Sequence, residues 1–466
     1  MLRINFILIV LVSAVFVSVA LAQERKTDVG TIEELNDRVL ALQQQILEMQ
    51  KRHDAEIAAL KEQINELAAG AGKQEKKSDI ASLRELAKAA ASEGAAAGQE
   101  AVPAPEVTYK SGGLGLQALN PEISFAGDFL FSTRQDNTSD QSSNFDFRVL
   151  DIHVESWLDP YTRFKAAIPV TEDEAKLGEG YITLYGITDN VNLTLGKFRQ
   201  QFGVVNRWHK HALDQVDFPL ALRQIFGEGG LNQSGLSVDW IMEPAGDVSQ
   251  ELTFQVTDGS NDRVFGENSH NRPSILAHYK NYRDLSKDTY LEYGLSGLVG
   301  WNDEWTVSGI AQDSRKMTTV LGADLSLLWE PTEKMRYRNI EWRSEAYLLD
   351  KRLLAPDGSG ADNINAWGLY SYLQSKISRT VDIGIRADYF RPDSKGYADS
   401  TLSPLAVTGD NPYMWQIGPY ITWWQSPFVK FRVEYNHAQG SGIDVPRDVI
   451  WLQAVFAAGP HKHERY

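Results

Sequence analysis

The second part of the chain, from residue 121 to residue 466, is a succession of short segments in which apolar and polar residues alternate. In the first segment, Ile123, Phe125 and Phe129 fall on one face of an extended strand, and Ser124 and Asp128 fall on the other. Side chains point alternately to the two sides of a strand, so such a segment separates an apolar environment from a wet one. We count about sixteen segments, and a strand needs roughly 9 to 11 residues to cross a bilayer.

Charged residues occupy the polar face of many of these segments. Clear examples are Phe164, Ala166 and Ile168 against Arg163 and Lys165; Leu236, Val238 and Trp240 against Ser237 and Asp239; Ile340, Trp342 and Ala346 against Glu341, Arg343 and Glu345; Ile383, Ile385 and Ala387 against Asp382, Arg386 and Asp388; and Phe431, Val433 and Tyr435 against Lys430, Arg432 and Glu434. A soluble β-sandwich would not place charges on its inner faces. The pattern predicts an all-β, antiparallel transmembrane barrel of about sixteen strands.

The connections between the segments alternate in length. Tight turns are expected at Asp159-Pro160, Asp189-Asn190, 331–334, Ser378-Arg379 and Ser426-Pro427, and longer polar loops at roughly 133–142, 170–177, 201–233, 258–273, 300–316, 350–363, 393–411 and 438–446. Short periplasmic turns and long outer loops are typical of bacterial outer-membrane barrels. An even number of strands places both ends of the barrel in the periplasm.

One segment breaks the rule of alternation. Phe145 and Phe147 do not share the phase of Leu150, Ile152 and Val154, although all five are apolar. A β-bulge inserts one extra residue into a strand and so restores the phase. Either a bulge lies in this segment or its boundaries are misplaced.

The first 120 residues have a different character. Residues 1–22 combine Arg3, an apolar run and a small-residue end, which predicts a secretory signal peptide. Residues 23–69 predict an α-helical coiled coil in the periplasm, because apolar residues recur at spacings of three and four. Its expected core is Ile32, Leu35, Val39, Leu42, Ile46, Met49, Ile57, Leu60, Ile64 and Leu67. Residues 70–120 are rich in Ala and Gly and predict a linker.

The oligomeric state of the coiled coil is open at this level. Ile or Val at the first core position with Leu at the second favours two strands, whereas the barrel architecture favours three. We expect a homotrimer.

Composition narrows the classes of function. The chain has no cysteine, which excludes disulfides and thiol chemistry, and a formal net charge of -16, which argues against a nucleic-acid partner. Ser, His, Asp and Glu are present, but no spacing isolates a nucleophile, so we expect no enzymatic activity and no cofactor. An enzyme in barrel form remains the class alternative.

The 201–233 loop is the predicted site of selectivity. The lumen of a sixteen-stranded barrel is too wide to select solutes, so an inward loop is needed. Arg207, Lys210 and Arg223 on this loop are expected to attract anions, with help from Arg163 and Lys165 on the wall.

His209 and His211 on the same loop raise the question of a metal. Two histidines separated by one residue suggest metal binding, but an accompanying carboxylate or third histidine is not obvious in the sequence. We therefore interpret them as exposed loop imidazoles.

Several short motifs resemble the phosphate-selective porin O and P family. They are Leu195–Gly203 (LGKFRQQFG), Asp217–Leu220, Gly227–Leu231 and the end from Gly459-Pro460-His461 to Tyr466. The resemblance spans most of residues 121–466 and implies a sixteen-stranded, usually trimeric outer-membrane porin. The coiled coil is similar to that of certain trimeric diffusion porins. Phosphate selectivity in that family depends on inward arginines and a lysine cluster. Here acids are mixed among the basic residues, so that selectivity is not carried over.

These patterns lead to one expectation and one alternative. The expectation is a passive channel in the outer membrane of a Gram-negative-type bacterium, whose partners are lipid and small hydrophilic solutes or ions, with anions as the suggested preference. The alternative is a non-conducting barrel that anchors a coiled-coil tether to the cell wall.

Overall fold

The computed structural model describes residues 121–459, apart from gaps at 136–140, 267–271, 303–305, 308–309, 312–315, 336, 355–360, 399–401 and 443–447. The chain divides into two units, Met1–Ala104 and Pro105–Tyr466, and all described residues belong to the second. The predicted signal peptide, coiled coil with its ten core residues, and linker lie outside the described residues.

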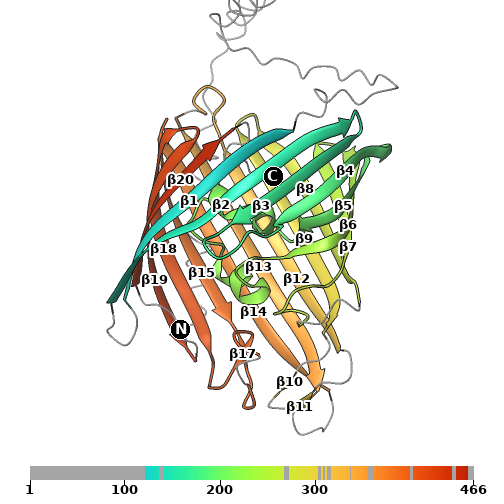
Figure 1. Cartoon of the computed structure of the whole chain (residues 1–466), viewed down its shortest axis with the longest axis vertical. Helices are drawn as coiled ribbons and strands as arrows, with labels where there is room; N and C mark the ends of the chain where they lie inside the picture. The colour runs from blue at the N-terminus through green and yellow to red at the C-terminus, as the bar shows by residue number, and fades with distance from the viewer. Residues whose placement is uncertain are drawn as a thin grey trace, which may run out of the picture. The chain divides into compact units, whose positions relative to one another are not determined.

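Sixteen antiparallel strands form a closed barrel, in which the first strand pairs with the last (Figure 1). The barrel strands are β1 (Glu122–Gln135), β2 (Gln141–Asp159), β3 (Thr162–Val170), β4 (Glu179–Thr188), β5 (Val191–Arg199), β6 (Asn232–Ala245), β7 (Val248–Thr257), β8 (Ser274–Ser286), β9 (Thr289–Asn302), β12 (Lys316–Trp329), β13 (Asn339–Leu354), β14 (Ala361–Ser378), β15 (Val381–Arg391), β18 (Tyr413–Ser426), β19 (Val429–Ser441) and β20 (Asp448–Ala458). The predicted fold class is confirmed.

The other elements lie in connections. Two small pairs of strands are β10 (Thr306–Val307) with β11 (Ile310–Ala311) and β16 (Asp393–Ser394) with β17 (Ala406–Val407). The β5–β6 connection holds η2 (Val205–Arg207), η3 (Lys210–Ala212) and α4 (Leu220–Phe226). Among the described residues, no helix is long and apolar enough to span a bilayer.

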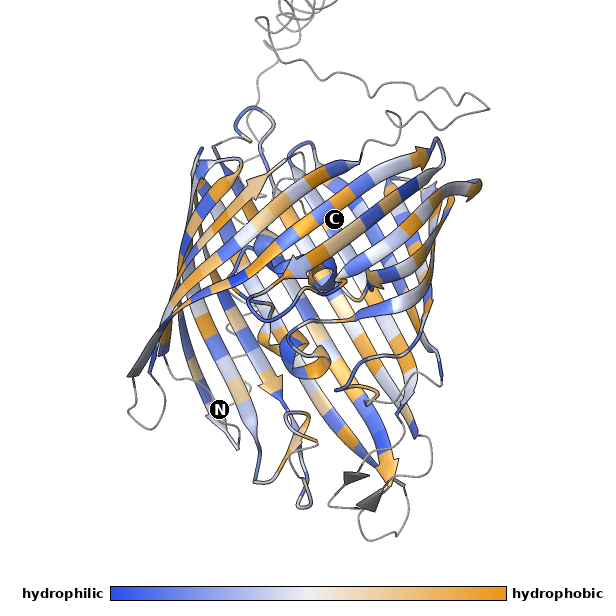
Figure 2. Cartoon of the chain, viewed as in Figure 1, coloured by the Kyte–Doolittle hydropathy of each residue, from blue (hydrophilic) through white to orange (hydrophobic). Residues whose placement is uncertain are grey.

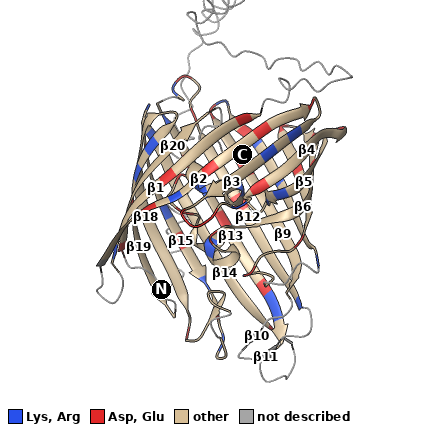
Figure 3. Ribbon diagram, viewed as in Figure 1, with Lys and Arg blue, Asp and Glu red and all other residues tan. Residues whose placement is uncertain are grey.

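Alternation along the strands separates lipid from the interior of the barrel. Where β18 pairs with β19, the apolar pair Trp423 and Phe431 is exposed, whereas the neighbouring pair Thr422 and Arg432 is buried. Figure 2 shows the same alternation of hydrophobic and hydrophilic positions along the barrel strands. Lys, Arg, Asp and Glu also lie on the strands (Figure 3). An exposed apolar face is stable here because lipid covers it.

The connections alternate in length in the expected way. Turns of two residues join β2 to β3 and β4 to β5 at the end of the barrel where β1 begins and β20 ends, and the long connections lie at the opposite end. Two turns that the sequence analysis does not name, Gly246-Asp247 and Lys287-Asp288, follow the same rule. The β12–β13 connection runs over 330–338 and is longer than the predicted 331–334.

The phase break in β2 is a β-bulge. In the pairing of β1 with β2, Asp128 lies opposite Val149 and Phe129 lies opposite Phe147, so Arg148 is the extra residue. The bulge lets both Phe147 and Ile152 belong to the outward face. It also turns the Arg148 side chain inward, toward Asp128.

Candidate functional site

The β5–β6 connection, residues 200–231, lies inside the barrel. Figure 1 shows its helix α4 surrounded by the barrel strands. Phe218, Leu222 and Ile225 of this connection have no exposed surface, and most of its other residues are buried as well. The partners that bury them are inward-facing residues of strands on several sides of the barrel. We call residues 200–231 the inner loop.

The base of the inner loop is closed by one side chain. The Asn206 amide donates to the backbone carbonyls of Gln200 (2.8 Å) and Leu231 (3.0 Å), and its oxygen accepts from the Leu231 amide (2.8 Å). Asn206 is fully buried. It holds together the two ends of the loop, which also meet through a hydrogen bond from the Gln200 amide to the Leu231 carbonyl at 3.1 Å.

An apolar cluster packs one side of the inner loop against the wall. Phe202 stacks on Tyr347 of β13, with ring centroids 5.8 Å apart. The wall contributes Tyr347, Leu349, Ile364, Ala366, Tyr370, Tyr372 and Phe390 to this cluster, and α4 contributes Leu220, Ala221, Leu222, Ile225 and Phe226. The interior of the barrel is therefore apolar on this side, where the loop docks against the wall.

Glu345 on β13 anchors the start of the inner loop. Its Oε1 accepts hydrogen bonds from the backbone amides of Val204 (3.1 Å) and Val205 (3.0 Å), and the hydroxyls of Tyr347 and Tyr370 also donate to its carboxylate. This buried wall carboxylate serves the loop backbone. It is not a free charge of the bore.

Charged side chains of β15 and β19 anchor the later part of the inner loop. Glu434 accepts from the Val216 amide (2.8 Å), and Arg386 donates to the Asp217 carbonyl (2.8 Å). Arg432 donates to the Leu213 carbonyl (2.9 Å). Alternation along the strands predicts these groups as charges of the lumen, but they bind backbone groups of the loop that are buried away from water.

Arg148, the bulge residue of β2, adds a further anchor, three strands from β19 around the barrel. Its guanidinium pairs with Asp128 of β1 and with Asp217 of the inner loop (2.9 Å), and it donates to the Val216 carbonyl (2.8 Å). Burial by itself would raise the pKa of Asp217, but the nearby charges of Arg223 and Arg148 outweigh it, so the pKa lies below its ordinary value.

The predicted cations of the inner loop fall into two separate networks. Lys210 and Arg223 share Glu228, with N–O distances of 3.6 Å and 3.3 Å, and Lys210 also lies 3.9 Å from Asp217. Burial lowers the pKa of Lys210, although Asp217 partly opposes this. Each of these two cations is therefore paired with a carboxylate.

Arg207 belongs to the other network. Its guanidinium donates to Gln201 (2.8 Å), and it has no ion pair with a carboxylate in the described part of the chain. Lys165, Asp239 and His278 are its electrostatic neighbours on β3, β6 and β8. Lys165 is buried, and Arg163 pairs with Glu155 of β2. The structure thus brings Arg207 and Lys165 together, away from Lys210 and Arg223.

Inward-facing charges near β2, β7 and β8 keep contact with solvent. The side chains of Glu155, Glu251 and Lys280 are 23%, 25% and 22% exposed. An inward side chain can be solvated only where the interior is not filled. Solvent therefore reaches the interior of the barrel beside these three strands.

The prediction of exposed imidazoles at His209 and His211 is wrong, because both are buried. They meet Asp151 and His153 of β2, which sequence reasoning missed. The signal was present: Asp151 and His153 are two residues apart on an inward strand face, like the two histidines of the loop. His209 also bonds Glu179 of β4 (2.9 Å).

The pKa values of the two loop imidazoles are shifted in opposite directions. Burial would lower the pKa of His209, but its hydrogen bonds to Asp151 and Glu179 hold the pKa above its ordinary value. Burial lowers the pKa of His211, against the opposing influence of Asp151.

Known protein sequences show limited similarity to this chain. No family model matches the sequence. An uncharacterized protein of Aquifex aeolicus is 29% identical over 126 residues, which are 27% of this chain and 26% of that protein. The match thus spans about a quarter of the relative's length.

Among solved structures, the chain is similar to the outer membrane channel DcaP of Acinetobacter baumannii, with a TM-score of 0.51 and 12% identity over 73% of this chain and 97% of that one. An anion-selective porin from Comamonas acidovorans has a TM-score of 0.46 and 9% identity over 73% of this chain and 99% of that one. At 12% identity the likeness to DcaP shows the fold alone: the described part of the chain has the closed barrel fold of that outer membrane channel.

Proposed function

We propose that this protein is an outer-membrane porin, a passive diffusion channel for small hydrophilic solutes or ions, with the inner loop as its constriction. The observation that carries the proposal is the position of residues 200–231. They lie inside the barrel, bonded to β13 through Glu345 and to β2 through Asp151. A loop fixed in this way narrows the bore and leaves water along one wall.

The inward-facing side chains that solvent reaches suggest which solutes pass through the channel. Arg207 makes no direct ion pair among the described residues, although Asp239 is near it, and Glu155, Glu251 and Lys280 supply both signs of charge. This supports small charged or polar solutes with a modest preference for anions at Arg207. Phosphate specificity is not part of the proposal, because Lys210, Arg223 and Arg386 serve ion pairs or the loop backbone.

The proposal includes the parts of the chain that lie outside the described residues. A signal peptide at 1–22 fits export to the outer membrane, and the coiled coil at 23–69 fits a homotrimer that extends into the periplasm. We propose no cofactor and no covalent chemistry.

Conductance in planar lipid bilayers tests the proposal. We expect discrete ohmic steps from the purified protein, and larger steps when residues 209–224 are replaced by a short Gly-Ser linker. The control is a similar linker in place of residues 332–335 of the exposed β12–β13 connection, which should leave the step size nearly unchanged. A folded barrel that passes no current in either form would favour the non-conducting anchor instead.

A further inference from the structure

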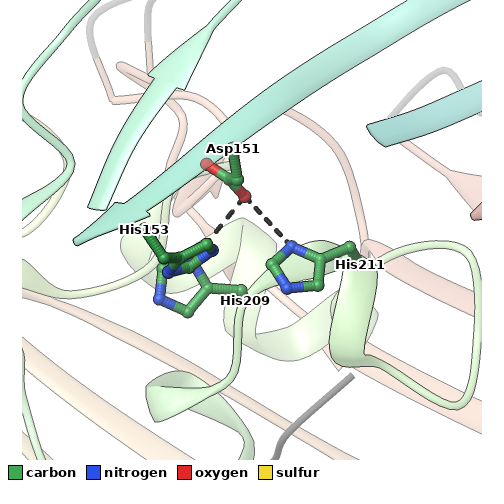
Figure 4. A group of neighbouring side chains, drawn as sticks. All are labelled: Asp151, His153, His209 and His211. Carbon is green, nitrogen blue, oxygen red and sulfur yellow. Dashed lines mark hydrogen bonds and ion pairs between the residues drawn. The ribbon is translucent and has the colours of Figure 1, made fainter. Parts of the chain in front are cut away.

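Four buried side chains with metal-binding atoms converge where the inner loop meets β2. Asp151 and His153 come from the strand, and His209 and His211 come from the loop (Figure 4). One ligand atom of each residue lies within 4.8 Å of the others. His211 Nδ1 lies 3.0 Å from Asp151 Oδ2, and His209 Nδ1 lies 3.8 Å from the same oxygen.

The local backbone explains the convergence. Residues two apart on a strand share a face, so Asp151 and His153 both point inward. The short helix η3 begins just after His209 and contains His211, which turns both imidazoles toward β2. All four residues are at most 6% exposed. The donors are therefore held in place by the fold and shielded from bulk water.

We propose that Asp151, His153, His209 and His211 bind one divalent transition-metal ion, with Zn²⁺ as the best fit, and that this ion fastens the inner loop to the barrel wall. Three imidazoles and one carboxylate are a donor set that Zn²⁺ accepts in tetrahedral geometry. Bonds of about 2.0 to 2.2 Å place tetrahedral ligand atoms roughly 3.3 to 3.6 Å apart, so small side-chain rotations suffice.

Glu179 holds the ligand His209 in place by a hydrogen bond to the ring nitrogen that faces away from the proposed metal ion. Its Oε2 bonds His209 Nε2 at 2.9 Å, and its Oε1 accepts the backbone amide of Arg199 at 2.8 Å. This fixes the ring of His209 with Nδ1 toward Asp151. A carboxylate that holds the far nitrogen of a ligand histidine is a general feature of metal sites and strengthens the ligand.

The competing arrangement is a metal-free hydrogen-bond network of the same side chains. The test uses full-length protein without a histidine tag, stripped with a chelator and then titrated with Co²⁺ and Zn²⁺ in detergent. We expect one equivalent of Co²⁺ with the intense visible absorption of four-coordinate cobalt, displaced by Zn²⁺. Wild-type protein that binds no Co²⁺, or binds it only with the weak bands of six-coordination, would overturn the proposal.

Matched variants locate the ion. His153→Ala and His211→Ala should abolish the four-coordinate spectrum, and Glu179→Gln should weaken Zn²⁺ binding roughly 10- to 100-fold. The control is the double variant His461→Ala and His463→Ala, which removes the other His-Lys-His triplet of the sequence and should bind as wild type does. A spectrum that is lost in the control and kept in correctly folded His211→Ala protein would also overturn the proposal. Heat-modifiable gel mobility reports folding, and none of these measurements depends on conductance.

Discussion

The carboxylate of Asp388 on β15 accepts a hydrogen bond from the backbone amide of Leu220, at 2.8 Å, across 168 residues of sequence. Leu220 is the first residue of α4, and the preceding residue gives this helix no side-chain cap. The barrel wall therefore supplies the cap, and the helix depends on the wall for its place. The second oxygen of Asp388 accepts from Arg386 Nε, also at 2.8 Å.

Removal of this carboxylate should loosen α4 and destabilise the barrel. Asp388→Ala leaves the Leu220 amide without an acceptor and the buried Arg386 without its ion pair, and we expect a loss of about 3 kcal/mol in the free energy of unfolding. Denaturant titration in phospholipid vesicles measures it. The exposed Asp410→Ala is the control and should change stability by less than about 0.5 kcal/mol. Equal effects of the two variants would contradict this role of Asp388.

Stability should depend on the charge of Asp217. Arg223 and Arg148 hold the pKa of this carboxyl below its ordinary value of about 3.9. A carboxyl group whose pKa is lowered by folding stabilises the folded state at pH values above its ordinary pKa. This stabilisation disappears as the pH falls through the folded-state pKa. Asp217→Asn should thus be less stable than wild type at pH 7, and the difference should shrink in acid below about pH 4. Unfolding free energies at several pH values check this, and a pH-independent difference would refute it.

Gly203 should tolerate no side chain. It has a φ of +60°, and an added Cβ would lie 2.3 Å from Glu345 Oε2. Gly186 has nearly the same backbone, with a φ of +63°, but nothing lies near its Cβ position. Both Gly→Ala variants incur backbone strain, and Gly203→Ala should be roughly 1 to 3 kcal/mol less stable than Gly186→Ala because it also displaces Glu345. Similar unfolding curves would show that the Glu345 contact is unimportant.

Charge reversal at Arg207 should shift ion selectivity toward cations. Arg207 lies beside the solvated part of the interior, so a charge here acts on passing ions with an energy on the order of 1 kcal/mol after screening, or a factor of about five in the permeability ratio. Reversal potentials across a salt gradient measure Arg207→Glu. Lys334→Glu, in the exposed β12–β13 connection, is the control. If both variants give the same reversal potential, Arg207 does not face the pathway.

The barrel could be predicted from the order of residues along the chain. Alternation is a local property, since each residue of a strand faces the side opposite to its neighbour, and lipid and water sort the two faces. For this reason the opposed faces of Phe431 and Arg432 could be read directly, and the phase break between Phe147 and Leu150 could be interpreted as a bulge.

The roles of the inward-facing charged residues could not be predicted in this way and became apparent from the folded molecule. The sequence pattern predicts Arg386 and Glu434 as charges that face the lumen, but both residues bind the backbone of the inner loop. The sequence predicts that His211 is an exposed loop residue, but its ring contacts Asp151, which precedes it by 60 residues in the sequence. Barrel closure brings distant strands around a common interior, and the partners of a loop that enters this space are set by that long-range geometry. The spacing of residues along the sequence therefore does not predict these partners.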